Sequence, residues 1–314
     1  MNEHRSCGCC GEVAQLAPLF TKSGYEIVRC GVCGLQFVST LPSTAELQAI
    51  YGKEFFHVGG KFSGHTASAG LINARQRVEA VRRLPAVGRS QWLDVGCATG
   101  DFLACAASVV EKASGIELSA FAAEKARARG LDVTNGDFLQ ADVPPAVFDV
   151  ISMWDYVEHV TNPSANFKKA FAVLKPGGYL AISTGDVESL LARLTGRFWH
   201  LMIPPRHLYF FSPVTIRRLL TSAGFELVQI GRPGKRVPLD FAAWKLATMT
   251  VPGLSPAVVR TCERLGLGRV APPVNLLDIM TVFARKPAWA RVSGSTQGHL
   301  GAKIPAELTQ RPVG

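Results

Sequence analysis

Apolar and polar positions alternate between strand-like and helix-like segments from about residue 91 onward. Short apolar runs predict strands, and the segments between them have helical periodicity. The predicted strands are Gln91–Val95, Ala113–Ile116, Asp132–Thr134, Phe148–Met153, Tyr179–Ser183, Phe225–Ile230 and Asp278–Ala284. The predicted helices between them are Phe102–Val109, Ala120–Arg129 and Pro163–Leu174. This alternation predicts an α/β fold with a seven-stranded, mostly parallel sheet and helices on both faces.

Residues typical of helix starts and of turns mark several boundaries of these elements. Asn162 followed by Pro163 is typical of a helix start, because asparagine caps the end and proline fits the first helical position. The sequence Lys175-Pro-Gly-Gly178 predicts a turn that ends this helix.

The region before the first strand is predicted to be mainly helical. Ser43 or Thr44 would cap an amphipathic helix that runs to Tyr51. The Gly- and Ser-containing stretch 59–70 predicts a loop, and the pattern is helical again over about 71–84.

These features divide the chain into a small N-terminal module, a helical linker or cap region, one large domain with two insertions, and a polar tail expected to be disordered. The corresponding residues are 1–40 for the module, 41–88 for the linker, 89–286 for the domain, about 185–215 and 237–273 for its insertions, and 287–314 for the tail.

The N-terminal module is defined by cysteines. Five of the eight cysteines lie within the first 33 residues, including the pairs Cys7/Cys10 and Cys30/Cys33. Two Cys-x-x-Cys turns at this separation can close a tetrahedral site, and zinc prefers such thiolate ligands. We assign a structural zinc to these four cysteines and leave Cys9 as a spare; free surface thiols are the alternative.

A glycine loop follows the first predicted strand of the large domain, Asp94-Val-Gly96-Cys97-Ala-Thr-Gly100. Its glycines allow the backbone to turn sharply and to approach a ligand at the start of the next helix. A dinucleotide fingerprint would require Gly-x-Gly-x-x-Gly, so the loop favours a ligand without a pyrophosphate.

Two acidic residues occupy matching places after the next two strands. Glu117, before Leu118, ends the second strand, where a carboxylate can accept hydrogen bonds from both ribose hydroxyls. Asp137 follows the third strand, where it can accept an adenine amino proton while Phe138 covers the ring. The alternative for each acid alone is a solvated loop residue.

The segment from Trp92 to Ser183 resembles the class I S-adenosylmethionine-dependent methyltransferases, which have a Rossmann-like sheet. The glycine loop and the acids that follow the strands match that family's cofactor motifs. The resemblance implies that S-adenosylmethionine binds at the carboxyl ends of the strands. The candidate cofactor-binding residues are Asp94, Gly96, Cys97, Gly100, Glu117, Leu118, Asp137, Phe138 and Trp154.

Later motifs are similar to the small-molecule branch that contains the ubiquinone-biosynthesis O-methyltransferases. They are Glu158-His159-Val160, His207-Leu-Tyr-Phe-Phe-Ser212 and the stretch from Arg217 to Phe225. The resemblance implies a small-molecule acceptor such as a sugar, a phenol or a lipid-linked precursor, with O-methylation favoured over C-methylation.

The segment after the fourth strand carries the candidate catalytic residues. If it is helical, Asp155, Glu158 and His159 share one face. That face could bind Mg²⁺ or another divalent ion, or His159 could deprotonate a hydroxyl nucleophile. In the ubiquinone-related enzymes a comparable run is associated with a metal, but Asp155 replaces their usual glutamate; a packed loop is the alternative.

His207 is the second candidate catalytic histidine. It follows Pro204-Pro-Arg206 in the insertion expected to fold over the substrate. It could serve as a base or as a fourth metal ligand, and a packed loop residue is the alternative. Trp154, Trp199 and Tyr209 are expected to be pocket walls or core.

The formal charge of +10 raises the question of an anionic partner. Much of the excess lies after Gly231, and in the insertion 237–273 basic residues alternate with apolar ones, as in a membrane-surface segment. Closure of the domain's own core is the competing interpretation. The basic residues lack the aromatic interleaving typical of nucleic-acid grooves, so nucleic acid is disfavoured as a partner.

Three other functions stay open. They are a ribosomal RNA or other nucleic-acid methyltransferase that binds through the zinc module, a non-catalytic cofactor-binding scaffold, and an NAD-dependent oxidoreductase. With no leader or spanning apolar run in the sequence, we expect a cytoplasmic protein. The pattern indicates nothing about the oligomeric state.

Overall fold

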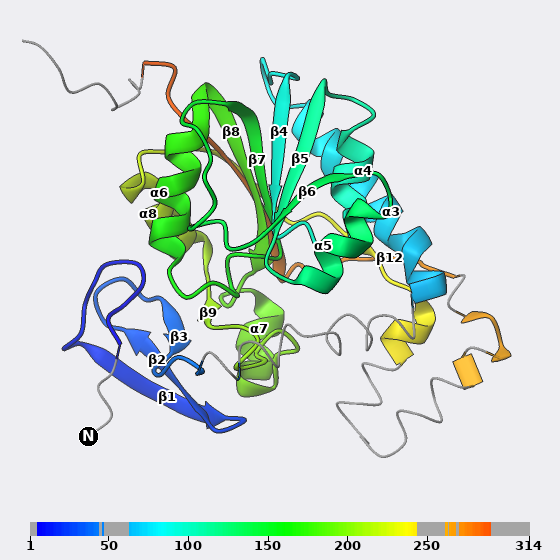
Figure 1. The fold of residues 1–314 in the computed structure, drawn as a ribbon. Coiled ribbons are helices and arrows are strands. Elements are labelled where there is room, and N and C mark those ends of the chain that lie inside the picture. Colours follow the sequence, from blue (N-terminus) through cyan, green and yellow to red (C-terminus); the bar gives the residue numbers. More distant parts are fainter. Residues whose placement is uncertain are drawn as a thin grey trace, which may run out of the picture.

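The computed structural model describes residues 5–43, 46, 63–243, 261–262, 264–267 and 270–289. Within these ranges the chain forms a large seven-stranded sheet, a small four-stranded sheet and a two-stranded ribbon. In Figure 1 the large sheet stands between two layers of helices, and the small sheet lies below one end of it.

The large sheet has the strand order β10-β13-β8-β7-β4-β5-β6. Strands β4 to β8 pair in parallel, whereas β13 is antiparallel to both β8 and β10. The strand bounds are β4 Gln91–Val95, β5 Lys112–Glu117, β6 Asp132–Asn135, β7 Phe148–Trp154, β8 Leu174–Gly185, β10 Glu226–Gly231 and β13 Ile279–Arg285. The predicted seven-stranded, mostly parallel sheet is confirmed.

Helices cover both faces of this sheet. In Figure 1, α3, α4 and α5 lie on one side, and α6 and α8 lie on the other. The helix bounds are α3 Ser63–Arg82, α4 Asp101–Ala106, α5 Ala120–Arg127, α6 Pro163–Val173, α7 Leu190–Thr195, the short 3₁₀ helix η1 Gly196–Phe198 and α8 Pro213–Ser222. Strands enclosed on both faces must be apolar along their length. Accordingly, six of the seven residues of β7 are buried.

Two of the predicted helix-capping residues, Asn162 and Ser43, make capping hydrogen bonds. The side chain of Asn162 accepts a hydrogen bond from the backbone N–H of Ala165, with Pro163 as the first residue of α6. Ser43 and Glu46 form a reciprocal pair, in which each side chain accepts a hydrogen bond from the other residue's backbone N–H. The helix predicted after Ser43 lies outside the described residues.

Two predicted loops are wrong in part. The stretch 175–178, predicted as a turn, lies within the bounds of β8, but the pairing with β7 passes over it: Leu174 pairs with Phe148 and Tyr179 with Val150. Gly177 has φ +80°, and its N–H donates to the carbonyl of Lys286. The loop predicted over 59–70 is also wrong from Ser63 onward, because α3 begins there.

The small sheet joins distant parts of the chain. Its order is β1-β2-β3-β9, and all pairs are antiparallel. The bounds are β1 Leu16–Lys22, β2 Tyr25–Cys30, β3 Gln36–Val38 and β9 Tyr209–Phe210. Strand β9 belongs to the first insertion of the large domain, so the cysteine module, defined here as residues 5–40, completes its sheet with a strand from that domain.

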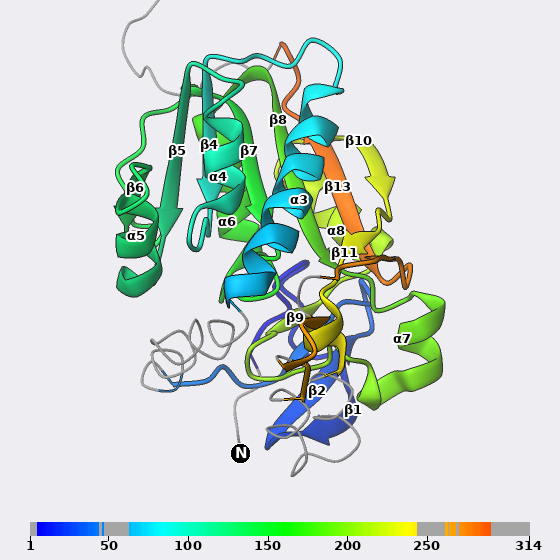
Figure 2. The same ribbon diagram turned by 90° about the vertical axis from the view of Figure 1, so that its right-hand side faces the viewer.

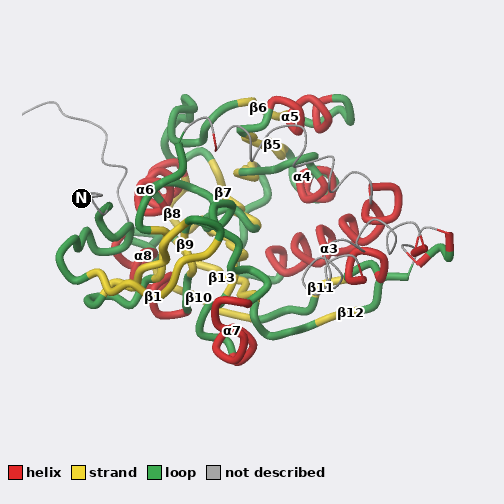
Figure 3. The backbone as a smooth tube through the Cα atoms, turned by 90° about the horizontal axis from the view of Figure 1, so that it is seen from below, coloured by secondary structure: helices red, strands yellow, loops and turns green. Residues whose placement is uncertain are grey.

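The ribbon consists of β11, Lys235–Arg236, and β12, Pro273–Val274. Seen from below in Figure 3, α3, β11 and β12 lie together on one side, while β1 and β9 lie toward α8. Most of the basic insertion between β11 and β12 and the tail from residue 290 lie outside the described residues, so the membrane and disorder predictions lie there as well.

Candidate active site at the carboxyl end of the sheet

The glycine loop connects β4 to α4 as predicted. Gly96 and Gly100 have φ angles of +71° and +84°, which L side chains rarely adopt. A methyl group added at Gly100 would lie 2.3 Å from the Leu131 side chain, and one added at Gly96 would lie 2.5 Å from the Tyr156 ring. Both positions therefore require glycine for conformation and for space.

Two acids flank this loop. Asp94 is buried and accepts a hydrogen bond from the Ser152 hydroxyl at 2.6 Å, and burial raises its pKa to about 7. Glu117, at the end of β5, accepts one backbone N–H on each oxygen, from Ala98 at 2.9 Å and from Ser119 at 2.8 Å. Burial raises the pKa of Glu117, and the two backbone bonds oppose that rise. These bonds hold the carboxylate against the glycine loop.

The third acid lies at the next strand end. Asp137 is exposed and accepts the backbone N–H of Leu139 at 2.9 Å. Phe138 points into the main core, where it is 2% exposed, and the Lys169 ammonium lies 5.2 Å from its ring centre. The acid thus faces solvent at the sheet edge while its aromatic neighbour anchors the loop.

The other three candidate cofactor residues differ in exposure. Cys97 is buried beside Gly115, whereas Leu118 is 61% exposed at the carboxyl end of β5. Trp154, the last residue of β7, packs on Phe102 with ring centres 5.3 Å apart. Its indole Nε1 is buried without a hydrogen-bond partner.

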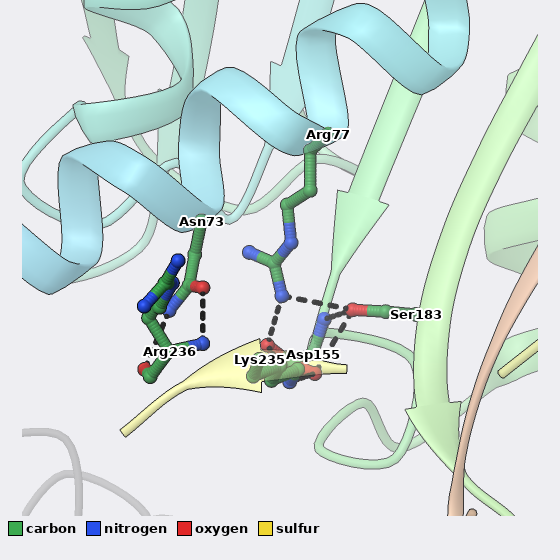
Figure 4. A network of polar contacts seen from close by, with 6 residues as sticks. All are labelled: Asn73, Arg77, Asp155, Ser183, Lys235 and Arg236. Atoms are coloured by element: carbon green, nitrogen blue, oxygen red, sulfur yellow. Dashed lines mark hydrogen bonds and ion pairs between the residues drawn. The ribbon is translucent and has the colours of Figure 1, made fainter. Parts of the chain in front are cut away.

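The segment after β7 is a turn, so the predicted helical face is wrong. Asp155 has φ +51°, which rotates its side chain away from the positions that follow. Figure 4 shows where it points: Arg77 of α3 and Lys235 of β11 approach it at 2.6 Å and 3.2 Å, and the Ser183 hydroxyl donates to it at 2.9 Å.

In this network Asp155 forms ion pairs with Arg77 and Lys235. Burial by itself would raise its pKa, but Lys235 and Arg77 together outweigh that effect and hold the pKa well below its usual range. Asp155 therefore stays ionised, and the charges of Lys235 and Arg77 balance its own. The predicted grouping of Asp155 with Glu158 and His159 is not formed.

Glu158 and His159 instead meet His207. One ligand-type atom from each of the three residues lies within 4.8 Å of the others. The two imidazole rings contact edge to face, with centres 4.8 Å apart. Each ring has Nδ1 at a backbone carbonyl, 2.8 Å from Arg206 for His159 and 2.7 Å from Leu201 for His207. The structure thus brings together three of the four predicted catalytic residues.

Their surroundings set unusual protonation states. Burial, followed by the charge of Asp155, raises the pKa of Glu158 to about 8, and its Oε2 is buried without a hydrogen-bond partner. Burial lowers the pKa of His159. Near neutral pH the site therefore pairs a largely protonated carboxyl group with a neutral imidazole.

This cluster lies next to the glycine loop. Tyr156, whose ring contacts Gly96, precedes Glu158 by two residues, and its hydroxyl donates to Asn166 at 2.9 Å. The turn of residues 155–161, called here the Glu158 turn, therefore links the glycine loop to the histidine pair.

The four predicted zinc ligands also converge. The sulfurs of Cys7, Cys10, Cys30 and Cys33 all lie within 4.8 Å of one another, and two of the separations are 3.5 Å. A tetrahedral zinc–thiolate site with bonds of about 2.3 Å has sulfurs about 3.8 Å apart. Each Cys-x-x-Cys turn is closed by a backbone hydrogen bond to the carbonyl of its first cysteine. The donor set fits zinc.

A Rossmann-like sheet with a glycine loop and acids at three successive strand ends defines an S-adenosylmethionine-dependent methyltransferase. The comparison with known families agrees. Residues 1–230 match the family model described as a methyltransferase domain, and the chain belongs to this family.

Curated relatives support the class, and a solved structure has the same fold. The chain is 31% identical over 163 residues to a ubiquinone biosynthesis O-methyltransferase of Thiobacillus denitrificans, covering 47% of this chain and 69% of the relative. The corresponding protein of Azoarcus is 34% identical over 152 residues, covering 44% and 65%. The Synechocystis magnesium protoporphyrin IX methyltransferase has the same fold with a TM-score of 0.52 at 11% identity, covering 78% of this chain and all of that one.

Sequence reasoning missed the residues that hold the site from a distance. Arg77 and Lys235 have no motif around them, and Leu208 is noted only within the run from His207 to Ser212. Tyr209 is expected to be a pocket wall or core residue, and it is buried, but its contacts with β3 and with Thr161 have no sequence signal. Their contacts become visible only where elements that are far apart in the sequence lie together.

None of the helices within the described residues has the length and apolar character that a membrane crossing requires.

Proposed function

We propose that this methyltransferase methylates a hydroxyl group of a small molecule, such as a phenol, a sugar or a lipid-linked precursor. The observation that carries the proposal is the cluster of Glu158, His159 and His207 next to the glycine loop. A hydroxyl nucleophile requires a base, and His159 belongs to the turn that contacts the glycine loop through Tyr156, with the His207 ring against it, which supports a role beside the methyl group. The O-methyltransferase names of the curated relatives support the same reaction type.

The residues at the strand ends fit the cofactor. Glu117 is a buried carboxylate at the end of β5, and its oxygens have lone pairs beyond the two backbone bonds that orient it. It would accept the ribose hydroxyls, while Asp137 would accept the adenine amino group. When bound, S-adenosylmethionine supplies an electrophilic methyl group on a sulfonium sulfur.

His159 is the proposed base. The contact of its Nδ1 with the Arg206 carbonyl requires a proton on Nδ1, so Nε2 is the accepting nitrogen of the neutral ring. The lowered pKa keeps the ring neutral near pH 7, as a base must be. As the acceptor oxygen takes the methyl group, Nε2 of His159 would accept the hydroxyl proton.

Glu158 would act beside the base as a mostly protonated acid. A neutral carboxyl group can donate a hydrogen bond to the acceptor or to an imidazole, and it avoids placing a buried anion near the charged Asp155. Magnesium gains no support here, because Asp155 is held by cations and imidazoles are poor ligands for Mg²⁺.

The cysteine module would bind one structural zinc through Cys7, Cys10, Cys30 and Cys33. All four positions of such a site come from the protein, so the metal would have no open position for chemistry. Its contribution would be to folding.

The direct test is methyl transfer from labelled S-adenosylmethionine to a panel of phenols, sugars and quinol precursors, with bulk RNA included. Label on a hydroxyl oxygen of a small molecule supports the proposal. Transfer to RNA, or to carbon alone, would replace it. Binding of S-adenosylhomocysteine by calorimetry verifies that the protein is competent before any negative result is interpreted.

A further inference from the structure

We propose that the cysteine module positions the candidate catalytic turn, and that Leu208 and Tyr209 are the positioning residues through which it does so. The inference rests on the proposed role of the Glu158 cluster and extends it: residues far from the cofactor loop would set the geometry of the histidine pair.

The first link is the backbone of Leu208. Its N–H donates to the carbonyl of Glu158 at 2.7 Å, and its own carbonyl accepts from the N–H of Val38 at 3.0 Å and from the Arg5 guanidinium at 3.2 Å. The backbone of one residue therefore bonds the Glu158 turn through its N–H and the cysteine module through its carbonyl. His207, the residue just before it, is held by the same backbone.

The second link is the side chain of Tyr209, which is 2% exposed. Its hydroxyl donates at 3.0 Å to the carbonyl of Thr161, the last residue of the Glu158 turn. Its ring lies under the Arg5 guanidinium, 4.6 Å from the ring centre, and its backbone pairs with Phe37 of β3. A single side chain thus spans from the module's sheet to the turn.

The third link connects Tyr209 to the cysteines. A methyl group added at Gly8, between Cys7 and Cys9, would lie 2.5 Å from the Tyr209 hydroxyl oxygen and 2.7 Å from its ring. The first cysteine turn therefore packs directly on Tyr209. Because the interior is close-packed, a change in the shape of this turn must displace the ring or the turn it supports.

These links form a continuous path from the cysteines to the histidine pair. The path runs through hydrogen bonds and close packing, and it does not pass through the glycine loop or Glu117. Figure 2 shows the corresponding arrangement, in which β1, β2 and β9 lie together beneath the carboxyl ends of the parallel strands. A disturbance of the module should therefore change the histidines and leave the cofactor residues in place.

The test uses the full-length protein labelled with ¹³C-histidine, with ring signals assigned through His159→Gln and His207→Gln. Tyr209→Phe removes only the hydroxyl that bonds Thr161. Gly8→Ala adds a methyl group that is too close to the Tyr209 ring and must displace it. Both should move the signals of His159 and His207 and speed amide exchange in residues 157–161 about tenfold, the effect of losing one buried hydrogen bond. Affinity for S-adenosylhomocysteine should stay within about twofold, or about 0.4 kcal/mol, because the path does not include the glycine loop or Glu117.

Matched controls are available within the same module. Tyr25→Phe removes a hydroxyl that bonds Glu46, outside the path. Gly31→Ala makes the equivalent change in the second cysteine turn, where the three nearest atoms all belong to Gln15, at 3.3–3.4 Å. Both should leave the two histidine signals and the exchange of residues 157–161 unchanged. A merely structural role of the module would affect all four variants alike, through stability.

Removal of zinc from the wild type provides an independent arm. At a temperature below the melting transition of the metal-free protein, chelation should move the same histidine signals, and restoring Zn²⁺ should return them. If the purified protein contains no zinc and binds none, the metal part of the proposed function fails, while the Tyr209 and Gly8 variants still test the path. Unchanged histidine signals in Tyr209→Phe and Gly8→Ala would overturn the inference.

Discussion

The protonation of Glu158 depends on its neighbours more than on its residue type. Burial and the nearby Asp155 raise its pKa, whereas Asp155, only three residues earlier, has a lowered pKa because two cations face it. The same chemical group therefore takes opposite charge states within one turn. Each state suits a role: Asp155 anchors two elements, and Glu158 supplies a neutral donor beside the histidines.

This difference makes stability depend on pH in a defined direction. The pKa of Glu158 is about 8 when folded against an ordinary value of 4.5, so its contribution is fully present below pH 4.5 and is lost as the pH rises through 8. Glu158→Gln cannot ionise. Its melting temperature should fall less between about pH 5 and pH 9 than that of the wild type.

The measurement is a series of thermal melts across that range. Glu111→Gln, at an exposed carboxylate, is the matched control and should follow the wild-type slope. A steeper fall for Glu158→Gln than for the wild type would contradict the raised pKa.

His159 is the second residue with a sharp expectation. His159→Gln should lower methyl transfer by roughly 100-fold, the usual contribution of a positioned base, while calorimetry finds cofactor affinity nearly unchanged. Parallel losses of affinity and stability would indicate a packing role instead. If His207→Gln has the larger effect on turnover, His207 is the base.

At the scale of elements, α3 clamps β11 against the carboxyl end of the sheet. Asn73 and Arg77 lie one helical turn apart on the same face of α3. Asn73 makes two hydrogen bonds with the backbone of Arg236, at 2.8 Å and 3.0 Å, and Arg77 reaches Asp155. Figure 4 shows both contacts side by side. The clamp holds the ribbon from which the second insertion departs.

Asn73→Ala removes both bonds to half-buried backbone groups. The free energy of unfolding should fall by about 1–3 kcal/mol, measured by denaturant titration, and exchange of the Arg236 amide should accelerate. Gln76→Ala on the exposed face of the same helix is the control and should change stability by less than about 0.5 kcal/mol. Because alanine favours a helix more than asparagine or glutamine does, helix propensity cannot cause a loss in either variant. Equal losses in the two variants would show that the bonds to Arg236 are not responsible.

At the scale of the molecule, the cysteine module and the large sheet share one core. Ile27, Val28 and Phe37 of the module belong to the same buried cluster as Ile151 and Ile182 of the sheet. Two parts that share a core are expected to unfold together. The boundary drawn at residue 40 from the sequence is therefore not a boundary in the packing, because buried side chains from both sides of it belong to one core.

Metal removal should therefore affect the whole protein. We expect one zinc per chain by elemental analysis, and chelation should lower the melting temperature by at least about 10 °C, because structural zinc contributes on the order of 10 kcal/mol of folding energy. The transition should stay single. An unchanged melt after verified metal loss, or separate unfolding of residues 5–40, would contradict this expectation.

The sequence by itself determined the large sheet and the local geometry of its motifs. Strand and helix periods are set by local burial, and the turns at Gly96 and Gly100 require residues that tolerate positive φ, so both signals are readable within a few positions. The spacing of Cys7, Cys10, Cys30 and Cys33 likewise follows from the geometry of two closed turns.

Only the tertiary structure decided which of these parts meet. The partner of Asp155 comes from α3 and β11, the partner of His159 comes from the first insertion, and the last strand of the module's sheet is β9. Pairings of this kind depend on long-range packing, which leaves no periodic signal near either residue. The sequence therefore predicted that Asp155 shares a helical face with Glu158 and His159. In the structure Asp155 has a left-handed backbone conformation, and its side chain pairs with Arg77 and Lys235, which are far from it in the sequence.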